Sequence, residues 1–268
     1  MSDVLDRIHR FEREIEMAGS RTMESPFGVG VLEPSLPLRH DSNYLLIERL
    51  PLGMGAQELA GEAERILGGA GLAHRSVVCF DAELGEKLEP QFKNLGWNVR
   101  RHIWMAQLRE SDRNPDLSIV QEVGEGDLRA GRTHEITSYP WGNEEVARQL
   151  LDAKLLLGQR AKTRFFGVPV HDEIVSWADL YVAQGVGQVE DVATKEKHRG
   201  KGYASAVVLR AAEEARAEGA DLVFLVADGD DWPKGLYGKL GFDTVGRLTK
   251  FFLTGLEPVH LGAPRTAS

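Results

Sequence analysis

The chain has 268 residues, of which 42% are hydrophobic and 27% charged, and this ordinary globular composition is enough for one large domain or two small ones. A single cysteine, Cys79, excludes an intrachain disulfide framework and a multi-cysteine metal site, and it fits a reducing cytoplasm. The formal net charge of -9 argues against a nucleic-acid-binding surface; it would suit a cationic substrate, although mild acidity is also what keeps many proteins soluble.

The start of the chain, residues 1–16, is charged throughout and lacks the apolar stretch of an export signal. Elsewhere, too, the sequence has no run of about 18 apolar residues, the length that spans a bilayer as a helix. We therefore expect a cytoplasmic protein with no membrane partner.

Apolar patterns in the second half of the chain predict a mixed α/β unit. In chain order the predicted elements are a strand from Leu117, a helix over 124–139, a helix over 143–158, strands at 163–170, 173–183 and 186–194, a helix over 203–219, a strand at 221–227, a short helix at 233–240 and a strand at 247–253. Asn143 is the expected N-cap of the second helix, and Asp230 or Asp231 of the last. Two-residue links between the middle three strands favour an antiparallel meander, and a helix crossover makes strand 221–227 parallel to its predecessor.

The first half of the chain repeats the pattern of the second half. A shift of 147 residues places Gly53 and Gly55 on Gly200 and Gly202. The apolar segments before and after each glycine pair also overlay, and QFKNLGW in the first half matches LYGKLGF in the second. A chance match over three consecutive elements is improbable, so we interpret the chain as a duplicated unit with a shorter first copy.

The two copies differ where chemistry would occur. The first glycine loop, PLGMGAQ, contains no cation, and Phe92 stands where the second copy has Tyr237. We therefore expect a degenerate domain at 1–112 whose site is lost or altered, a catalytic domain at 113–256, and a loose tail at 257–268.

The segment KHRGKGYA, residues 197–204, places two glycines and three basic side chains before a predicted helix. The free N–H groups and the dipole of a helix N-terminus attract anions, so this loop predicts a phosphate-bearing ligand. The spacing is neither a Rossmann fingerprint nor a P-loop. Together with the strand before it, the strand after it and LYGKLGF, the segment resembles the GNAT (Gcn5-related N-acetyltransferase) superfamily over residues 117–254. Lys197 departs from that family's Gln/Arg-x-x-Gly-x-Gly/Ala signature.

The resemblance implies a mixed, mostly antiparallel sheet flanked by helices, in a tandem GNAT-like acyl-CoA N-acyltransferase fold. It also implies acetyl-CoA as cosubstrate, with no metal. Pantetheine would pair with the main chain of the strand that precedes the loop, and the loop would hold the pyrophosphate. The residues implied in binding are Val192, Ala193, Thr194, Lys197, Arg199, Gly200, Lys201, Gly202, Tyr203 and Ala204.

Two residues are the candidates for catalysis. Tyr237 matches the family tyrosine that lies beside the CoA sulfur and would protonate the leaving thiolate, although a packing tyrosine is the alternative. Glu190 is the candidate base, because strand alternation would put it on the same face as Val192 and Thr194. A salt-bridged or solvated glutamate, with a water relay as the base, is the competing interpretation.

Weaker signals concern the acceptor. Trp177 and Asp179 share a strand face beside the expected cleft, and Trp141 lies in a link that borders the acceptor in this superfamily; core packing or loop anchoring explains all three equally simply. His134 and Glu135 lack a metal-like partner at helical spacing and are interpreted as surface residues.

The sequence therefore predicts an N-acetyltransferase that uses acetyl-CoA and a small-molecule or peptide amine, as a monomer or a homodimer. A non-catalytic acyl-CoA-binding scaffold is the alternative from another class, and a preference for a longer acyl group is a third possibility. The acceptor itself is not readable, because the same fold serves many substrates.

Overall fold

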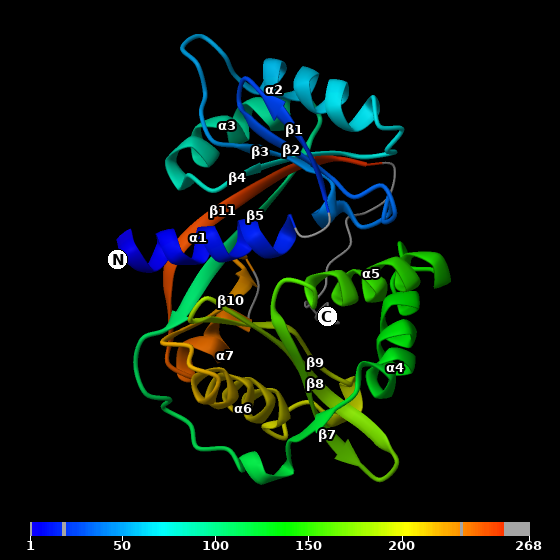
Figure 1. Cartoon of the computed structure of the whole chain (residues 1–268), viewed down its shortest axis with the longest axis vertical. Helices are drawn as coiled ribbons and strands as arrows, with labels where there is room; N and C mark the ends of the chain where they lie inside the picture. The colour runs from blue at the N-terminus through cyan, green and yellow to red at the C-terminus, as the bar shows by residue number, and fades with distance from the viewer. Residues whose placement is uncertain (1, 18–19, 231–232, 255–268) are drawn as a thin grey trace.

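The computed structural model describes residues 2–17, 20–230 and 233–254 (Figure 1). Within them, eleven strands form one sheet. The strands are β1 (Arg21–Ser25), β2 (Gly28–Leu32), β3 (Tyr44–Ile47), β4 (Arg75–Cys79), β5 (Asn98–Gln107), β6 (Gln121–Val123), β7 (Lys162–Val170), β8 (Glu173–Ala183), β9 (Val186–Thr194), β10 (Leu222–Asp228) and β11 (Phe242–Leu253). The α-helices are α1 (Ser2–Glu16), α2 (Ala56–Ala63), α3 (Ala82–Asn94), α4 (Glu125–Ser138), α5 (Glu144–Leu157), α6 (Tyr203–Ala217) and α7 (Pro233–Lys239).

The sheet is mixed and mostly antiparallel, as predicted. Its order is β1-β2-β3-β4-β11-β5-β10-β9-β8-β7-β6, and only the pairs β3–β4 and β9–β10 are parallel. The two halves of the chain exchange strands at the centre: β5, from the first half, lies between β11 and β10, and β11, from the second half, lies between β4 and β5. The strands on the two sides of the β5–β11 pair follow similar orders and directions: β4, β3 and β2 on one side correspond to β10, β9 and β8 on the other. The duplication and the domain boundaries stay predictions.

Side chains alternate between the two faces of the sheet along each strand. Because apolar side chains occur on both faces, helices pack on both. Along β10, Val223 and Leu225 pack into the core under α6, whereas Leu222 and Phe224 pack with α1. Helices α2 and α3 form a third core with β3 and β4. Helix α1 lies across β11 and β5 at the middle of the molecule (Figure 1).

The structure confirms most of the predicted elements of the second half. Strands β7, β8 and β9 form the expected meander, β10 runs parallel to β9, and the Asn143 side chain caps α5 by accepting from the N–H of Val146 at 2.9 Å. The strand predicted from Leu117 begins only at Gln121, because residues 117–119 form a 3-10 turn. The last strand is longer than predicted and begins at Phe242.

Two further predictions concern the end of the chain. The Asp230 carboxylate accepts a hydrogen bond from Arg101 at 3.1 Å, and its capping of α7 stays a prediction; Asp231 and the tail at 257–268 lie outside the described residues. In the described part of the chain, no helix is long and apolar enough to cross a membrane.

Candidate functional site

The parallel strands β9 and β10 pair only over part of their length. Their register runs from Val186 opposite Leu222 to Val189 opposite Leu225 and ends there, so residues 190–194 have β8 on one side and no paired strand on the other. The divergence begins at a β-bulge in β9. Asp191 lies in that bulge with a φ of 52°, a left-handed conformation that is rare for a residue other than glycine.

A buried ion cluster holds the bulge. Lys154 of α5 lies 2.6 Å from Asp179 and 3.0 Å from Asp191, and Arg132 of α4 contacts both carboxylates, at 2.9 Å for Asp191. All four side chains are at least nine-tenths buried. Although burial raises the pKa of Asp191, the two cations hold it below its usual range. Two cations and two carboxylates balance, which is the condition under which buried charge is tolerated.

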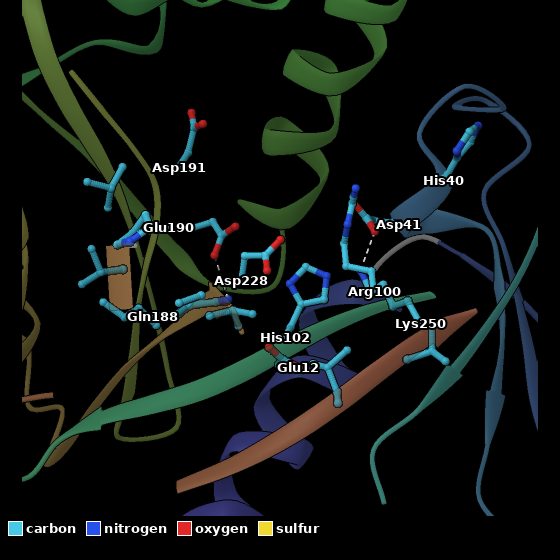
Figure 2. Close-up of a pocket in the computed structure, with 18 of the residues that line it drawn as sticks. Glu12, His40, Asp41, Arg100, His102, Gln188, Glu190, Asp191, Asp228 and Lys250 are labelled. Carbon is cyan, nitrogen blue, oxygen red and sulfur yellow. Dashed lines mark hydrogen bonds and ion pairs between the residues drawn. The ribbon is translucent and has the colours of Figure 1, made fainter. Parts of the chain in front are cut away.

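A cavity of about 190 Å³ opens where β9 and β10 diverge and continues across β5 and β11 to the first half of the chain (Figure 2). Val192, Glu190 and Tyr237 line it near the divergence, and Arg100 and Lys250 line it on β5 and β11. Tyr237 is only 8% exposed and meets Phe242 edge-on, with ring centroids 6.5 Å apart. The site therefore joins residues that are far apart in sequence.

The glycine loop lies at the end of β9. Gly200 and Gly202 have φ angles of 76° and 84°, and the space where a Cβ would stand is open at both. No side chain caps the first turn of α6 in the described residues, and Lys197, Arg199 and Lys201 are exposed around it. Free amides and three cations thus face one region of solvent, which is the chemistry of an anion site.

The corresponding loop of the first half has a left-handed first glycine but an extended second one, Gly55 with a φ of -155°, and its amides are occupied. Gly53 has a φ of 81° with open space beside it. The N–H of Ala56 donates to the side chain of Gln91 at 3.1 Å, and the N–H of Gly55 donates to Glu58 at 2.8 Å. Side chains of the protein itself therefore take the positions that a phosphate would need.

The strands beside the glycine loop of the first half do not separate as β9 and β10 do. Strands β3 and β4 stay paired to their last residues, Ile47 opposite Cys79. Phe92, the counterpart of Tyr237, is fully buried and stacks on Phe251 with centroids 4.2 Å apart. The structure thus shows a strand divergence only in the second half of the described chain.

The alternation argument for Glu190 was wrong. Because the bulge inserts a residue, Glu190 lies opposite Asp179 and shares its face, whereas Thr194 lies opposite Ser176 on the other face, with their hydroxyl oxygens 2.8 Å apart. Val192 packs into the core under α6. Glu190 still lines the cavity and accepts a hydrogen bond from Gln188 at 3.2 Å.

The three residues predicted near the acceptor lie in the interior. Trp177 and Asp179 are 2% and 0% exposed, and Asp179 belongs to the ion cluster. Trp141 is 8% exposed and stacks on Tyr139 at 4.9 Å. This burial does not favour substrate contact, which stays a prediction for all three.

The interpretation of Glu135 as a surface residue was wrong. His134 is exposed, as expected, but Glu135 is half-buried. Burial, reinforced by the nearby Asp191 carboxylate, raises its pKa to about 7. The signal that could have found it is its position one turn after Arg132, on the side of α4 that faces the ion cluster.

The model of the acetyltransferase (GNAT) family matches residues 130–242, from α4 to the start of β11. Residues 130–242 form a GNAT acetyltransferase domain. No curated protein matches the sequence. In the described residues no group of three or more His, Cys, Asp or Glu side chains could hold a metal ion.

Solved structures share the fold of nearly the whole chain. A conserved protein of unknown function from Staphylococcus epidermidis is similar with a TM-score of 0.67 at 16% identity, covering 88% of this chain and 94% of its own. A GCN5-related N-acetyltransferase from Kribbella flavida has a TM-score of 0.62 at 17% identity, covering 96% and 97%. At these identities the likeness shows the fold alone, and it extends over both halves of the GNAT-containing chain.

The ion cluster gives a stability prediction. Lys154→Met leaves two buried carboxylates with one cation, so we expect the free energy of unfolding in urea to fall by about 3–5 kcal/mol. Lys162→Met is the matched control, because Lys162 is 58% exposed and its pair with Glu218 contributes less than about 1 kcal/mol. Equal losses in the two variants would contradict the structural role of the cluster.

Glu135 gives a pH prediction. Its folded pKa of about 7 lies above the ordinary value of 4.5, so the folded state keeps a proton that the unfolded state releases, and stability falls as pH rises between these values. Glu135→Gln removes this loss. Urea unfolding of variant and parent should show the variant gaining on the order of 2 kcal/mol relative to the parent from pH 4 to pH 8. A difference that does not change with pH would refute the raised pKa.

Proposed function

We propose that the chain is an acetyl-CoA-dependent N-acetyltransferase with one working site in its GNAT domain, where an acceptor amine attacks the thioester directly. The observation that carries the proposal is the divergence of β9 and β10 beside an uncapped helix N-terminus. The divergence supplies a strand edge and a cavity, and the loop supplies an anion site at one end of that edge.

The pyrophosphate and the pantetheine of acetyl-CoA each have a matching feature. The amides at the start of α6, from Gly202 to Ala204, would hold the pyrophosphate, with Arg199 and Lys201 adding charge. Arg199 also donates from Nε to the main-chain oxygen of Thr194 at 3.2 Å, which ties the loop to the end of β9. Pantetheine would add to the free edge of residues 190–194 as a further strand does.

The chemistry follows from the residues at the divergence. The amine nitrogen attacks the thioester carbon, the C–N bond forms and the C–S bond breaks, while a main-chain N–H of β9 stabilises the developing oxyanion. The Tyr237 hydroxyl gives its proton to the leaving thiolate. Glu190, directly or through water, takes the proton that the amine loses.

The first half would bind no second acetyl-CoA. Gln91 and Glu58 occupy the loop amides there, and β3 and β4 leave no open edge. In the second half Leu236 stands at the position of Gln91 and has no group to accept the bond that Gln91 accepts from Ala56. The division into one working and one silent copy rests on this contrast.

Calorimetric titration with acetyl-CoA tests the site and its number. We expect saturation near one equivalent, loss of binding in Gly200→Val, and unchanged binding in Gly53→Val. The two glycines have φ angles of 76° and 81° and open surroundings, so the variants carry similar backbone strain and differ in ligand contact alone. Saturation near two equivalents would refute the single site, and equal losses would remove the assignment of the loop.

Tyr237→Phe tests the catalytic step. Loss of the proton donor should lower kcat by about 100-fold and leave the Kd for acetyl-CoA within about twofold, because the ring still packs. Tyr139→Phe is a control tyrosine outside the cavity lining and should keep kcat. A normal kcat in Tyr237→Phe would remove the acid assignment, and acetyl-CoA binding without turnover on any amine would favour the scaffold interpretation.

A further inference from the structure

The acetyl transfer proposed for the GNAT domain leaves one proton without an acceptor. An aliphatic primary amine in neutral water is an ammonium ion, because its pKa lies near that of a lysine side chain, about 10. It must lose one proton before its nitrogen can attack and a second one as the amide forms. In the proposed reaction Glu190 takes the second proton and Tyr237 supplies the proton of the free thiol, so the first proton requires another base.

That base must lie on the face of the sheet from which the amine arrives. Tyr237 and Ala227 belong to the core under α6, so in the proposed reaction the thiolate leaves toward that face. Glu190 lies on the opposite face, because Gln188, two residues before it, stands opposite Tyr181 of the core that packs with α1. An amine that gives a proton to Glu190 therefore approaches from the α1 face.

His102 of β5 lies on that same face. It is two residues before Trp104, which packs in the core with α1, and it stands directly opposite Asp228 of β10 in the antiparallel register. His102, Asp228 and Glu190 all line the cavity and are directed into the same part of it (Figure 2). One oxygen of the Asp228 carboxylate accepts from the main-chain N–H of Asp230 at 2.9 Å, which restrains that side chain opposite His102.

Base strength favours an imidazole over a carboxylate for the first proton. The ordinary pKa values of histidine and glutamate side chains are about 6.5 and 4.3, so an ammonium gives its proton to the imidazole more favourably by about 100-fold. A carboxylate on the neighbouring strand stabilises the imidazolium that forms. The imidazole can also return the proton to water, because histidine titrates near neutral pH.

We propose that His102, held opposite Asp228, takes the first proton from the ammonium of the acceptor. An N–H bond of the ammonium breaks, its electron pair stays on nitrogen and its proton bonds to the imidazole; the neutral amine then attacks the thioester carbon. The second proton goes to Glu190, which restores Tyr237 through water, and His102 releases its proton to solvent. The products are the amide, free CoA and one proton, so the protons balance.

The inference rests on the proposed function and adds a catalytic residue to it. His102 comes from β5, in the first half of the chain, whereas Glu190 and Tyr237 come from the GNAT domain. The strand exchange at the centre of the sheet would therefore complete the catalytic site.

The test compares two amines of similar size that differ in protonation. At about pH 7.5 ethylamine is almost entirely an ammonium ion, whereas 2,2,2-trifluoroethylamine is mostly neutral, because fluorine lowers the pKa of its ammonium form. With the full chain and acetyl-CoA, His102→Gln should lower kcat/KM for ethylamine by about 100-fold and for trifluoroethylamine by less than about threefold. Equal losses would overturn the inference, because a merely structural role lowers both values alike; an unchanged value for ethylamine would overturn it as well.

Two further variants make the result independent of the folding of His102→Gln. Asp228→Asn should lower kcat/KM for ethylamine by about tenfold and spare trifluoroethylamine. His134→Gln is the matched control and should keep both values, because His134 is exposed and lies outside the cavity lining. If His102→Gln loses acetyl-CoA binding, Asp228→Asn carries the test, and equal losses for both amines in it overturn the inference. Acetyl-CoA binding by the parent with no transfer to any amine would instead defeat the proposed function, and the inference with it.

Discussion

The antiparallel pairing of β5 with β11 is the contact on which the rest of the structure depends. It runs from Phe242 opposite Gln107 to Phe252 opposite Asn98. On its outer side, β11 of the second half pairs with β4 of the first half, and β5 of the first half pairs with β10 of the second half. Without this pair the first half would end at β4 and the second at β10, each with an unpaired edge, which is an unfavourable state for a sheet. The exchange of β5 and β11 joins the strands of both halves into one continuous sheet.

Helix α1 reinforces that union on one face. Its apolar side chains Ile8, Phe11 and Ile15 recur at intervals of three and four residues and pack on the centre of the sheet, where Phe11 meets Phe224 edge-on at 5.4 Å. Ion pairs at its flank reach both halves, to Glu48 and to Asp221. These pairs are partly exposed and contribute little each, so burial of the apolar stripe is the main stabilising term.

The sequence predicted what short-range patterns determine. The meander β7–β9 with its two-residue links, the Asn143 cap and the glycine loop follow from spacing within about ten residues, and the parallel β9–β10 pair follows from the helix crossover. The bulge at Asp191 could not be predicted, because a strand with one inserted residue reads like a regular strand. That one residue changes the face of every side chain beyond it, which is why Glu190 and Thr194 lie on opposite faces.

Long-range pairing was invisible for a different reason. The sequence of β5 is equally compatible with pairing to strands of its own half or of the other half. Its pairing with β10 and β11 is visible only in the three-dimensional structure. The ion cluster was missed likewise, since Arg132, Lys154, Asp179 and Asp191 come from four elements and each alone resembles a surface charge. The raised pKa of Glu135 was missed for the same reason, because it results from burial of Glu135 next to the cluster and from the nearby Asp191 carboxylate.

The two glycine loops share the conformation of their first glycine but differ at the second glycine and in the hydrogen bonds of their amides. Gly53 and Gly200 share the left-handed conformation and open surroundings, yet the amides behind Gly53 are taken by Glu58 and Gln91. A phosphate would have to displace hydrogen bonds already made within the protein in the first half, whereas at α6 it would replace water. The proposed difference in binding would therefore come from the Glu58 and Gln91 side chains, from the conformation of the second glycine, and from whether the neighbouring strands separate. The β5–β11 pairing also brings a strand face of the first half, with Arg100, to the cavity that opens beside β9 and β10.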